Sequence, residues 1–407
     1  MGPAMLVTAA FIGPGTVTVC SIAGYRYGYA LLWALLFALL ATIVLQEMSA
    51  RLGIISKAGL SEALRQQIRH PVLRTVALAL VFSAILIGNS AYEAGNISGG
   101  VLGVQELFGP FQLPLAGYLL NGWNLLIGLL AAWLLLSGSY KLMEKTLITL
   151  VALMSIVFLL TAGMSLRTEG AFRQMLSGLF IPHAPAGSWL TVLGLIGTTI
   201  VPYNLFLHAS SAAEKWKENE DLKTARWDTV LAISLGGLVS LAIVVSSAAL
   251  QQHTGEIKSA ADLARQLEPL LGSSAKFFLA TGLFAAGITS AITAPLAAAW
   301  AATGIWPEKK QNGRSAMQRP LFKIVALSVL FIGLLFSASG YRPIQIIRFA
   351  QAANGLLLPF VAAFLLWLMN RPSLLGKHLN TLTQNLIGLI VVLLTIALGT
   401  KMLTTLF

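Results

Sequence analysis

The sequence predicts an all-α polytopic membrane protein made of two halves of opposite orientation and one further helix. Of its 407 residues, 57% are hydrophobic and only 10% are charged, whereas soluble domains contain about 25% charged residues. Apolar runs long enough to cross a bilayer, which takes about 20 residues, follow one another along the chain. Two of these runs are broken at a proline in matching positions half a chain apart. These three observations together predict the fold class.

Eleven membrane spans are expected, separated by short connections that contain charged residues, glycine or proline. The eighth apolar run is long for a single span, so we expect it to tilt or to extend beyond the bilayer. The expected spans are approximately 4–24, 30–50, 75–104, 117–137, 146–165, 189–211, 228–250, 274–303, 321–338, 344–369 and 382–403.

Lysine and arginine are concentrated in every second connection. If the N-terminus is cytoplasmic, the inner connections and the adjoining helix ends hold 18 of the 27 basic residues. The positive-inside rule therefore predicts a cytoplasmic N-terminus and an extracytoplasmic C-terminus. The only sizeable outside connection is then 251–273, in which we expect a short surface helix at 260–267.

Spans one to five and spans six to ten have opposite topologies, because five is an odd number. We expect one integral membrane transporter domain over 1–407. Within it, 1–165 forms the first inverted repeat, 189–369 forms the second, and 382–403 is an appended eleventh helix. Two inverted repeats that each open with a broken helix are the plan of the leucine-transporter (LeuT) fold.

The two breaks are the most informative positions in the chain. The first is Gly13-Pro14-Gly15 and the second is Val201-Pro202. Proline removes a backbone donor and clashes with the preceding turn, and glycine leaves helical geometry at little steric cost. An unpaired backbone group costs several kcal/mol in hydrocarbon, so such breaks are buried in protein or line a cavity. Paired broken helices mark the substrate site of a transporter.

Composition excludes several other classes of protein. The single cysteine, Cys20, cannot form an internal disulfide, and the sequence contains no Cys/His cluster typical of a zinc site. It also contains no nucleophile–base pair, so we expect neither an enzyme nor a cofactor. The net charge of +12 is assigned to cytoplasmic loops rather than to nucleic-acid binding. The expected partners are membrane lipid and a small transported cation or solute, with a monomer as the simplest assembly.

Four motifs along the chain resemble the natural resistance-associated macrophage protein (Nramp) family of proton-coupled divalent-metal transporters. Leu45–Ile54 resembles the second helix of the family, and Val201–His208 resembles its sixth-helix signature Met-Pro-His-Asn-Leu-Tyr-Leu-His. Gly287–Thr293 and Gln351–Pro359 resemble the eighth and tenth helices. The resemblance implies a LeuT fold, a metal-ion symporter that works by alternating access, and a bacterial inner (plasma) membrane location.

The chain differs from the family at the metal ligands that the resemblance implies. The first-helix motif Asp-Pro-Gly-Asn supplies Asp and Asn ligands, and the matching residues here are Gly13 and Thr16. The sixth helix supplies a Met thioether and a backbone carbonyl three residues earlier, and the matching residues are Val201 and Thr198. The histidine of the family signature is Tyr203 here. Carboxylate, carboxamide and thioether are therefore all absent from these positions.

The remaining candidates for substrate binding are uncharged, so we expect no tightly held, dehydrated Mn²⁺ or Fe²⁺ and assign no metal ligand. Dehydration of a divalent ion near the bilayer midplane is costly without charged partners. Two interpretations are open: a weakly held, largely hydrated cation, or a small neutral or zwitterionic organic solute such as an amino acid. A transport-dead or sensory relative is a third. The candidate residues are Gly13, Thr16, Thr198, Val201, Tyr203, Asn204, Gln351 and Asn354.

Proton movement has two candidate residues. The family has an Asp three residues before a Glu in its third helix, and here Ser90 replaces the Asp while Glu93 is retained. An ionisable residue within a membrane span is a functional hypothesis by default, and His208 titrates near neutral pH when unperturbed. Alternatively, Glu93 holds helices together and His208 is structural. Loss of the first-helix Asp predicts weak or absent proton coupling.

Overall fold

The computed structural model describes residues 4, 12–115, 118–137, 141–216, 218–250, 257–306 and 320–406. Most of the start of the first predicted span, at 5–11, lies outside the described residues. Eight helical segments in the described part are long and apolar enough to cross a membrane, and α6 and α18 contribute two shorter apolar segments. With α2 at the first position, helices occupy all eleven predicted spans.

The first half of the chain supplies five of the spans and three smaller elements. The spans are α2 (Pro14–Tyr27), α3 (Leu32–Ser56), α5 (Pro71–Phe108), α6 (Gly122–Ser137) and α7 (Lys141–Ser165). Between them lie α4 (Leu60–Gln67) and the antiparallel hairpin of β1 (Gln112–Leu115) and β2 (Tyr118–Asn121), in which Gln112 pairs with Asn121. Helix α8 (Ala171–Phe180) then leads to the second half.

The second half opens with a helix in two pieces, α9 (Trp189–Thr199) and α10 (Pro202–Lys215). The further spans are α11 (Leu222–Ala248), α14 (Ala275–Ile305), α15 (Pro320–Ser337), α16 (Pro343–Leu368) and α18 (Leu382–Leu406). Short helices connect them: η1 (Asn219–Asp221), α12 (Ala260–Ala264), η2 (Arg265–Leu267), α13 (Glu268–Leu271), η3 (Gly272–Ser274) and α17 (Pro372–Leu375).

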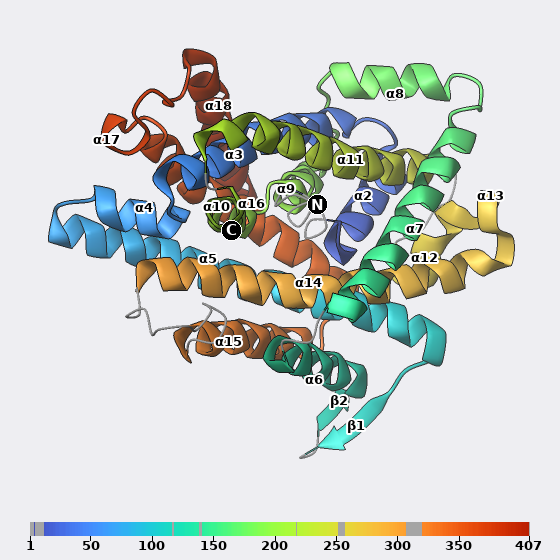
Figure 1. Cartoon of the computed structure of the whole chain (residues 1–407). Coiled ribbons are helices and arrows are strands. Elements are labelled where there is room, and N and C mark those ends of the chain that lie inside the picture. Colours follow the sequence, from blue (N-terminus) through green and yellow to red (C-terminus); the bar gives the residue numbers. More distant parts are fainter. Residues whose placement is uncertain are drawn as a thin grey trace.

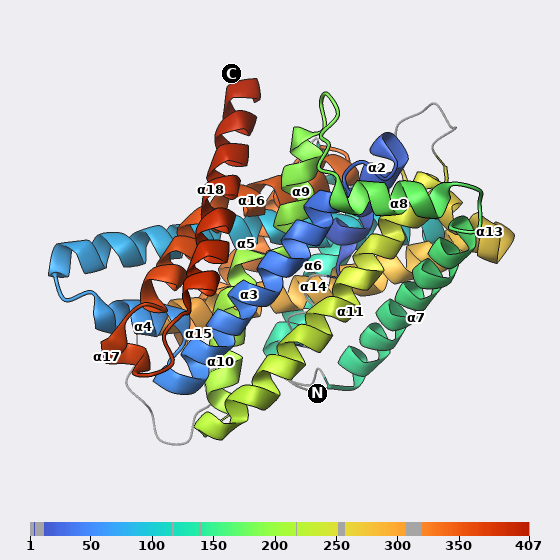
Figure 2. The ribbon, with the colours of Figure 1, turned by 90° about the horizontal axis from the view of Figure 1, so that it is seen from above.

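The broken helices lie at the centre of the molecule. In Figure 1, α2, α9 and α10 lie between a layer formed by α3 and α11 and a layer formed by α5 and α14, with α15 and α6 outside the second layer. Figure 2 shows the same arrangement from above. The two layers enclose the breaks, as a substrate site within the membrane requires.

The second layer is held together by close helix packing. A Cβ atom added at Gly287 of α14 would lie 2.6 Å from the backbone nitrogen of Gly100 in α5. Small residues let two helix backbones approach closely, and this is a common basis of helix association in membranes. Helices α5 and α14 are the third spans of their halves, so corresponding spans pack against each other.

Several predicted boundaries are wrong, and most of them lie in the connections. The connection 251–273 is not the only sizeable one among those expected outside, because α8 forms within 166–188. The fourth span begins at Gly122 rather than at 117, because the preceding residues form the hairpin. The helix expected at 260–267 does form, but it is not a simple surface helix, since Leu263 and Leu267 are fully buried.

Candidate functional site

Both breaks restart as helices at a proline. Gly13 is the extended residue before α2, with φ −111° and ψ −176°, and Pro14 is the first helical residue. Ile200 and Val201 separate α9 from α10, which begins at Pro202. Proline suits this position because the first helical N–H has no partner within the helix. The two breaks therefore have the same construction on the side where the helix restarts.

A direct hydrogen bond joins the two breaks. The Thr16 Oγ1 of α2 lies 2.8 Å from the Thr198 Oγ1 of α9, and either hydroxyl can be the donor. Both side chains are almost completely buried. Both residues are predicted site residues, and the structure brings them together from opposite halves of the chain. The bond uses only one of the two hydroxyl protons, so the hydroxyl that accepts it still has a proton of its own to donate.

Gly13 faces α14 and α5. A Cβ atom added at Gly13 would lie 2.9 Å from the Ser290 Oγ and 3.8 Å from the Tyr92 Oη. The serine hydroxyl thus occupies the space into which a longer side chain at position 13 would extend. Ser290 is fully buried in the middle of α14. A polar residue within an apolar run is visible in the sequence and could have identified Ser290 as a site residue.

Helix α16 crosses both breaks at Gln351. A Cβ atom added at Gly15 would lie 2.6 Å from the Cδ of Gln351, and one added at Gly197 would lie 3.1 Å from its backbone carbonyl carbon. Glycine is required at Gly197, where a side chain would overlap the backbone of α16, whereas a side chain at Gly15 would displace the side chain of Gln351. The predicted residue Gln351 therefore belongs to the site. Asn354, one turn further along, lies near Gly88 of α5 instead.

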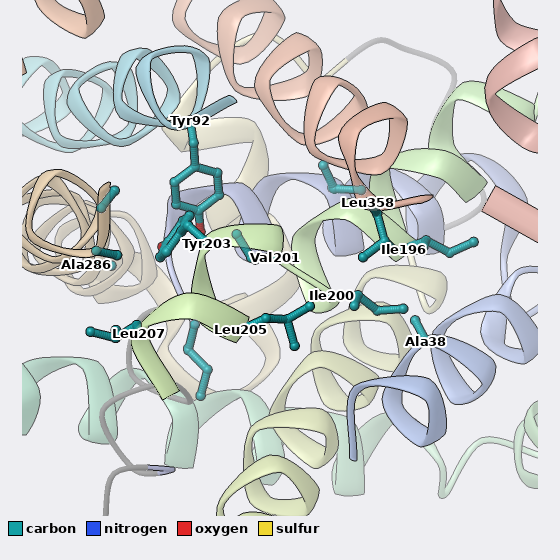
Figure 3. Close-up of a cluster of buried hydrophobic side chains, with 14 of the residues drawn as sticks. Ala38, Tyr92, Ile196, Ile200, Val201, Tyr203, Leu205, Leu207, Ala286 and Leu358 are labelled. Atoms are coloured by element: carbon teal, nitrogen blue, oxygen red, sulfur yellow. The ribbon is translucent and has the colours of Figure 1, made fainter. Parts of the chain in front are cut away.

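The second break also carries an aromatic contact. The rings of Tyr203 and Tyr92 meet edge to face, with centroids 5.3 Å apart and an angle of 64° between the planes. Figure 3 shows Tyr92 pointing toward Tyr203 beside Val201. The Tyr203 hydroxyl has no hydrogen-bond partner among the described residues. Both tyrosines are fully buried, so Tyr92 is a further site residue that the sequence analysis missed.

Unpaired polar atoms gather on the helices that meet at the breaks. Asn204 on the first turn of α10 has no hydrogen-bond partner for either side-chain atom among the described residues, and the same holds for the Ser290 Oγ and the Gln351 Oε1. A buried polar group without a partner costs about 1–3 kcal/mol. Several such groups around one break indicate a place for water or for a polar ligand.

The two candidate proton carriers lie against different helices. Glu93 is fully buried on α5, where its Oε2 accepts a 3.3 Å hydrogen bond from the Asn96 amide and its side chain packs against Gly333 of α15. The Nδ1 of His208 lies 2.8 Å from the Gln46 Oε1 of α3. The hydrogen bonds of Glu93 and His208 therefore lead to different neighbours, Asn96 on α5 and Gln46 on α3.

The C-terminal part of α3 forms an ion-pair network. Arg51, which is only 2% exposed, pairs with Glu47 at 3.0 Å, and Glu47 also pairs with Arg226 of α11 at 2.8 Å. Arg51 donates further hydrogen bonds to the carbonyl of His378 and to the Asn380 side chain, before α18. The network joins α3 to the second half at the end where the basic connections lie.

The chemistry of the site follows from its donors, which are hydroxyls, carboxamides and backbone carbonyls. The described residues contain no group of three or more His, Cys, Asp or Glu side chains that could hold a metal ion. Neutral oxygen ligands suit hard cations, but a dehydrated divalent ion normally also requires carboxylates. These groups can therefore bind a polar ligand directly, or contact a hydrated cation through the water molecules around it.

Comparisons with known sequences match one family over the whole chain. The family model of natural resistance-associated macrophage protein-like proteins (Nramp) matches residues 4–405. A divalent metal cation transporter MntH of Verminephrobacter eiseniae is 27% identical over 397 residues, covering 93% of this chain and 83% of the relative. A MntH of Yersinia pestis is 27% identical over 413 residues, covering 100% of this chain and 95% of the relative.

Solved structures share the fold. A manganese transporter of Eremococcus coleocola, in complex with an aromatic bis-isothiourea substituted compound, has a TM-score of 0.75 and 21% identity and covers 98% of this chain and 84% of that one. MhsT in complex with L-phenylalanine has a TM-score of 0.62 and 16% identity and covers 98% of both chains. At these identities the likeness concerns the fold, which is the predicted LeuT fold.

Proposed function

Because this chain belongs to the Nramp family of membrane proteins, we propose that it is a secondary transporter that moves a divalent cation across the membrane. The relatives named as divalent metal cation transporters support a metal ion as the substrate, and for this reason we do not favour an organic solute. The cation is held with most of its hydration shell, between the two breaks. Proton coupling is weak or absent.

The observation that carries this proposal is the neutral donor set around the breaks. The Thr16 and Thr198 hydroxyls bridge the two halves, and unpaired amide atoms of Asn204 and Gln351 lie on the adjoining helices. The Cβ and Cγ atoms of Glu93 pack against Gly333 of α15. Removing the water molecules that are bound directly to a divalent ion is costly. Neutral hydroxyl and amide oxygens are therefore expected to contact these water molecules rather than to replace them.

We assign transport to alternating access between two inverted repeats, 1–165 and 189–369, with 382–403 appended. The matching prolines of the two breaks and the packing of α5 on α14 support this division. The ion-pair network of Arg51, Glu47 and Arg226 lies on the side that we take as cytoplasmic, together with the N-terminus. We place the protein in a bacterial plasma membrane, in keeping with its bacterial relatives.

Uptake into proteoliposomes tests the proposal. The purified chain is reconstituted with an internal dye that senses divalent metals, and Mn²⁺, Mg²⁺ or Ca²⁺ is added outside. We expect saturable entry of at least Mg²⁺ and Mn²⁺, and much slower entry for Asn204→Leu, which removes an unpaired amide at the second break. Absence of entry for every divalent ion, with the reconstituted protein folded, would contradict transport of a divalent cation.

A further inference from the structure

A second cavity lies between α16 and α18 and shares no lining residue with the breaks. Its volume is about 400 Å³, within the range of about 300–1,000 Å³ that is usual for ligand sites. Its walls are mainly apolar, and its polar lining residues come from the end of α16. The lining residues are Ala363, Leu366, Trp367, Asn370, Arg371, Leu389 and Val392.

Close contacts between the two helices fix the walls of this cavity. A Cβ atom added at Gly388 of α18 would lie 2.8 Å from the Cδ1 of Leu366 in α16. The side-chain amides of Asn370 and Asn385 join the adjacent ends of the helices by two hydrogen bonds of 2.8 Å each. Figure 2 shows α18 beside α16. The cavity is therefore formed by packed helices rather than by a loop.

The guanidinium group of Arg371 is positioned by an aromatic ring. Its Cζ atom lies 4.1 Å from the centroid of the Trp367 ring, which is the geometry of a cation–π contact. Within the described residues its side chain forms no ion pair and no hydrogen bond. The sequence from 309 to its end contains no aspartate or glutamate, and Glu47, near the start of α18, is already engaged by two arginines. The N–H donors of Arg371 are therefore available to a ligand.

The cavity adjoins a surface that faces lipid. Helices α16 and α18 are membrane spans, and the side chains of α18 around the cavity are apolar and exposed. Trp367 lies in the last turn of α16, where aromatic residues of membrane spans meet the lipid headgroups. A ligand that fits is apolar along the helices and anionic at the end of α16. The exposed apolar side chains are Leu386, Leu389, Ile390 and Leu393.

We propose that this cavity binds one anionic phospholipid, with an acyl chain between α16 and α18 and the phosphate group on Arg371. The planar guanidinium group matches two phosphate oxygens, and the Trp367 ring holds its plane in place. With a cytoplasmic N-terminus the end of α16 is cytoplasmic, and basic residues beside a span on that side attract anionic lipids. The appended eleventh helix thus completes a lipid site with the tenth. This inference does not depend on which ion the breaks carry.

Binding is tested on the purified full chain by thermal unfolding in detergent micelles that contain an increasing fraction of phospholipid. We expect a saturable rise in the unfolding midpoint with phosphatidylglycerol, which is anionic, and not with phosphatidylcholine, which is zwitterionic. Arg371→Gln should raise the half-saturating fraction of phosphatidylglycerol about tenfold, which corresponds to about 1.4 kcal/mol. The matched control Arg69→Gln, which neutralises an exposed arginine expected on the same side of the membrane, should respond as the wild type does.

The acyl chain and the phosphate group are tested separately. Ala363→Leu narrows the cavity and leaves Arg371 in place, and it should weaken the response to phosphatidylglycerol as Arg371→Gln does. Glycerol phosphate, which has the phosphate group but no acyl chain, should not raise the midpoint relative to sodium chloride of equal ionic strength. Stabilisation by glycerol phosphate would show that the site takes a free anion and would overturn the proposal. Equal responses to the two phospholipids, or an unchanged response in either variant, would also overturn it.

Discussion

At Gly13 the missing side chain limits what the first break can bind. The space beyond its Cα is occupied by the Ser290 hydroxyl, 2.9 Å from where a Cβ atom would lie. A carboxylate at this position therefore needs room as well as a favourable partner ion. A side chain at position 13 would therefore require the Ser290 hydroxyl to move.

Restoring a carboxylate should tighten metal binding only when Ser290 makes room for it. We expect Gly13→Asp/Ser290→Ala to lower the half-saturating Mn²⁺ concentration for uptake by about tenfold or more relative to Ser290→Ala, which corresponds to about 1.4 kcal/mol. Gly13→Asp alone should reconstitute poorly or transport slowly because of the overlap. Equal Mn²⁺ affinity in the double variant and in Ser290→Ala would show that position 13 does not face the ion.

Glu93 offers a test of proton movement that is separate from the test of metal binding. Its Oε2 accepts a hydrogen bond from Asn96, and its Cβ and Cγ atoms pack against Gly333, so Glu93→Gln, which keeps the shape of the side chain, should preserve cation uptake. We expect only a weak dependence of wild-type uptake on external pH between about pH 5 and pH 8, and its loss in Glu93→Gln, because an ionisable residue within a membrane span is the candidate for proton movement.

The matched control for this variant is Glu62→Gln, which removes a carboxylate from the short helix α4 and should leave the pH profile unchanged. A Glu93→Gln protein with the wild-type pH profile would show that Glu93 only holds α5 and α15 together.

The crossing of α2 and α16 shows how an element positions the site. A side chain at Gly15 would overlap Gln351, whereas Gly163 of α7 has no atom within 4 Å of an added Cβ. Overpacking a buried contact costs about 1–3 kcal/mol, so Gly15→Ala should slow uptake about tenfold while Gly163→Ala stays close to the wild type. Equal uptake by the two variants would mean that the contact between Gly15 and Gln351 of α16 does not affect transport. Initial uptake rates at matched reconstitution levels provide the measurement.

The membrane-spanning helices could be predicted from the sequence, but the helix and strands in the connections could not. Apolar runs of sufficient length identify helices that face lipid, and each break was visible as a proline flanked by small or extended residues. Helix α8 and the hairpin at 112–121 were missed, because their residues do not form long apolar runs. Their positions depend on tertiary contacts, such as Gly178 of α8 against the backbone of Tyr29.

For the whole molecule, the packing of separate helices explains why the sequence identified only part of the site. Thr16, Thr198 and Gln351 were predicted from the breaks and from the family motif, and the fold places them together. Ser290 and Tyr92 come from α14 and α5, and their relation to Gly13 depends on how these helices pack. Helix packing cannot be deduced from hydropathy, which records only that both helices are apolar.

The central claim is that a neutral site carries a largely hydrated divalent cation. The most direct test is competition in proteoliposomes, in which uptake of a fixed Mn²⁺ concentration is measured while Mg²⁺ is raised outside. Oxygen donors that contact the ion through water distinguish these two ions poorly, so Mg²⁺ should halve Mn²⁺ uptake at a concentration within about tenfold of that of Mn²⁺. Mn²⁺ uptake that saturates and resists a large excess of Mg²⁺ would instead require direct coordination of the metal and would contradict the account.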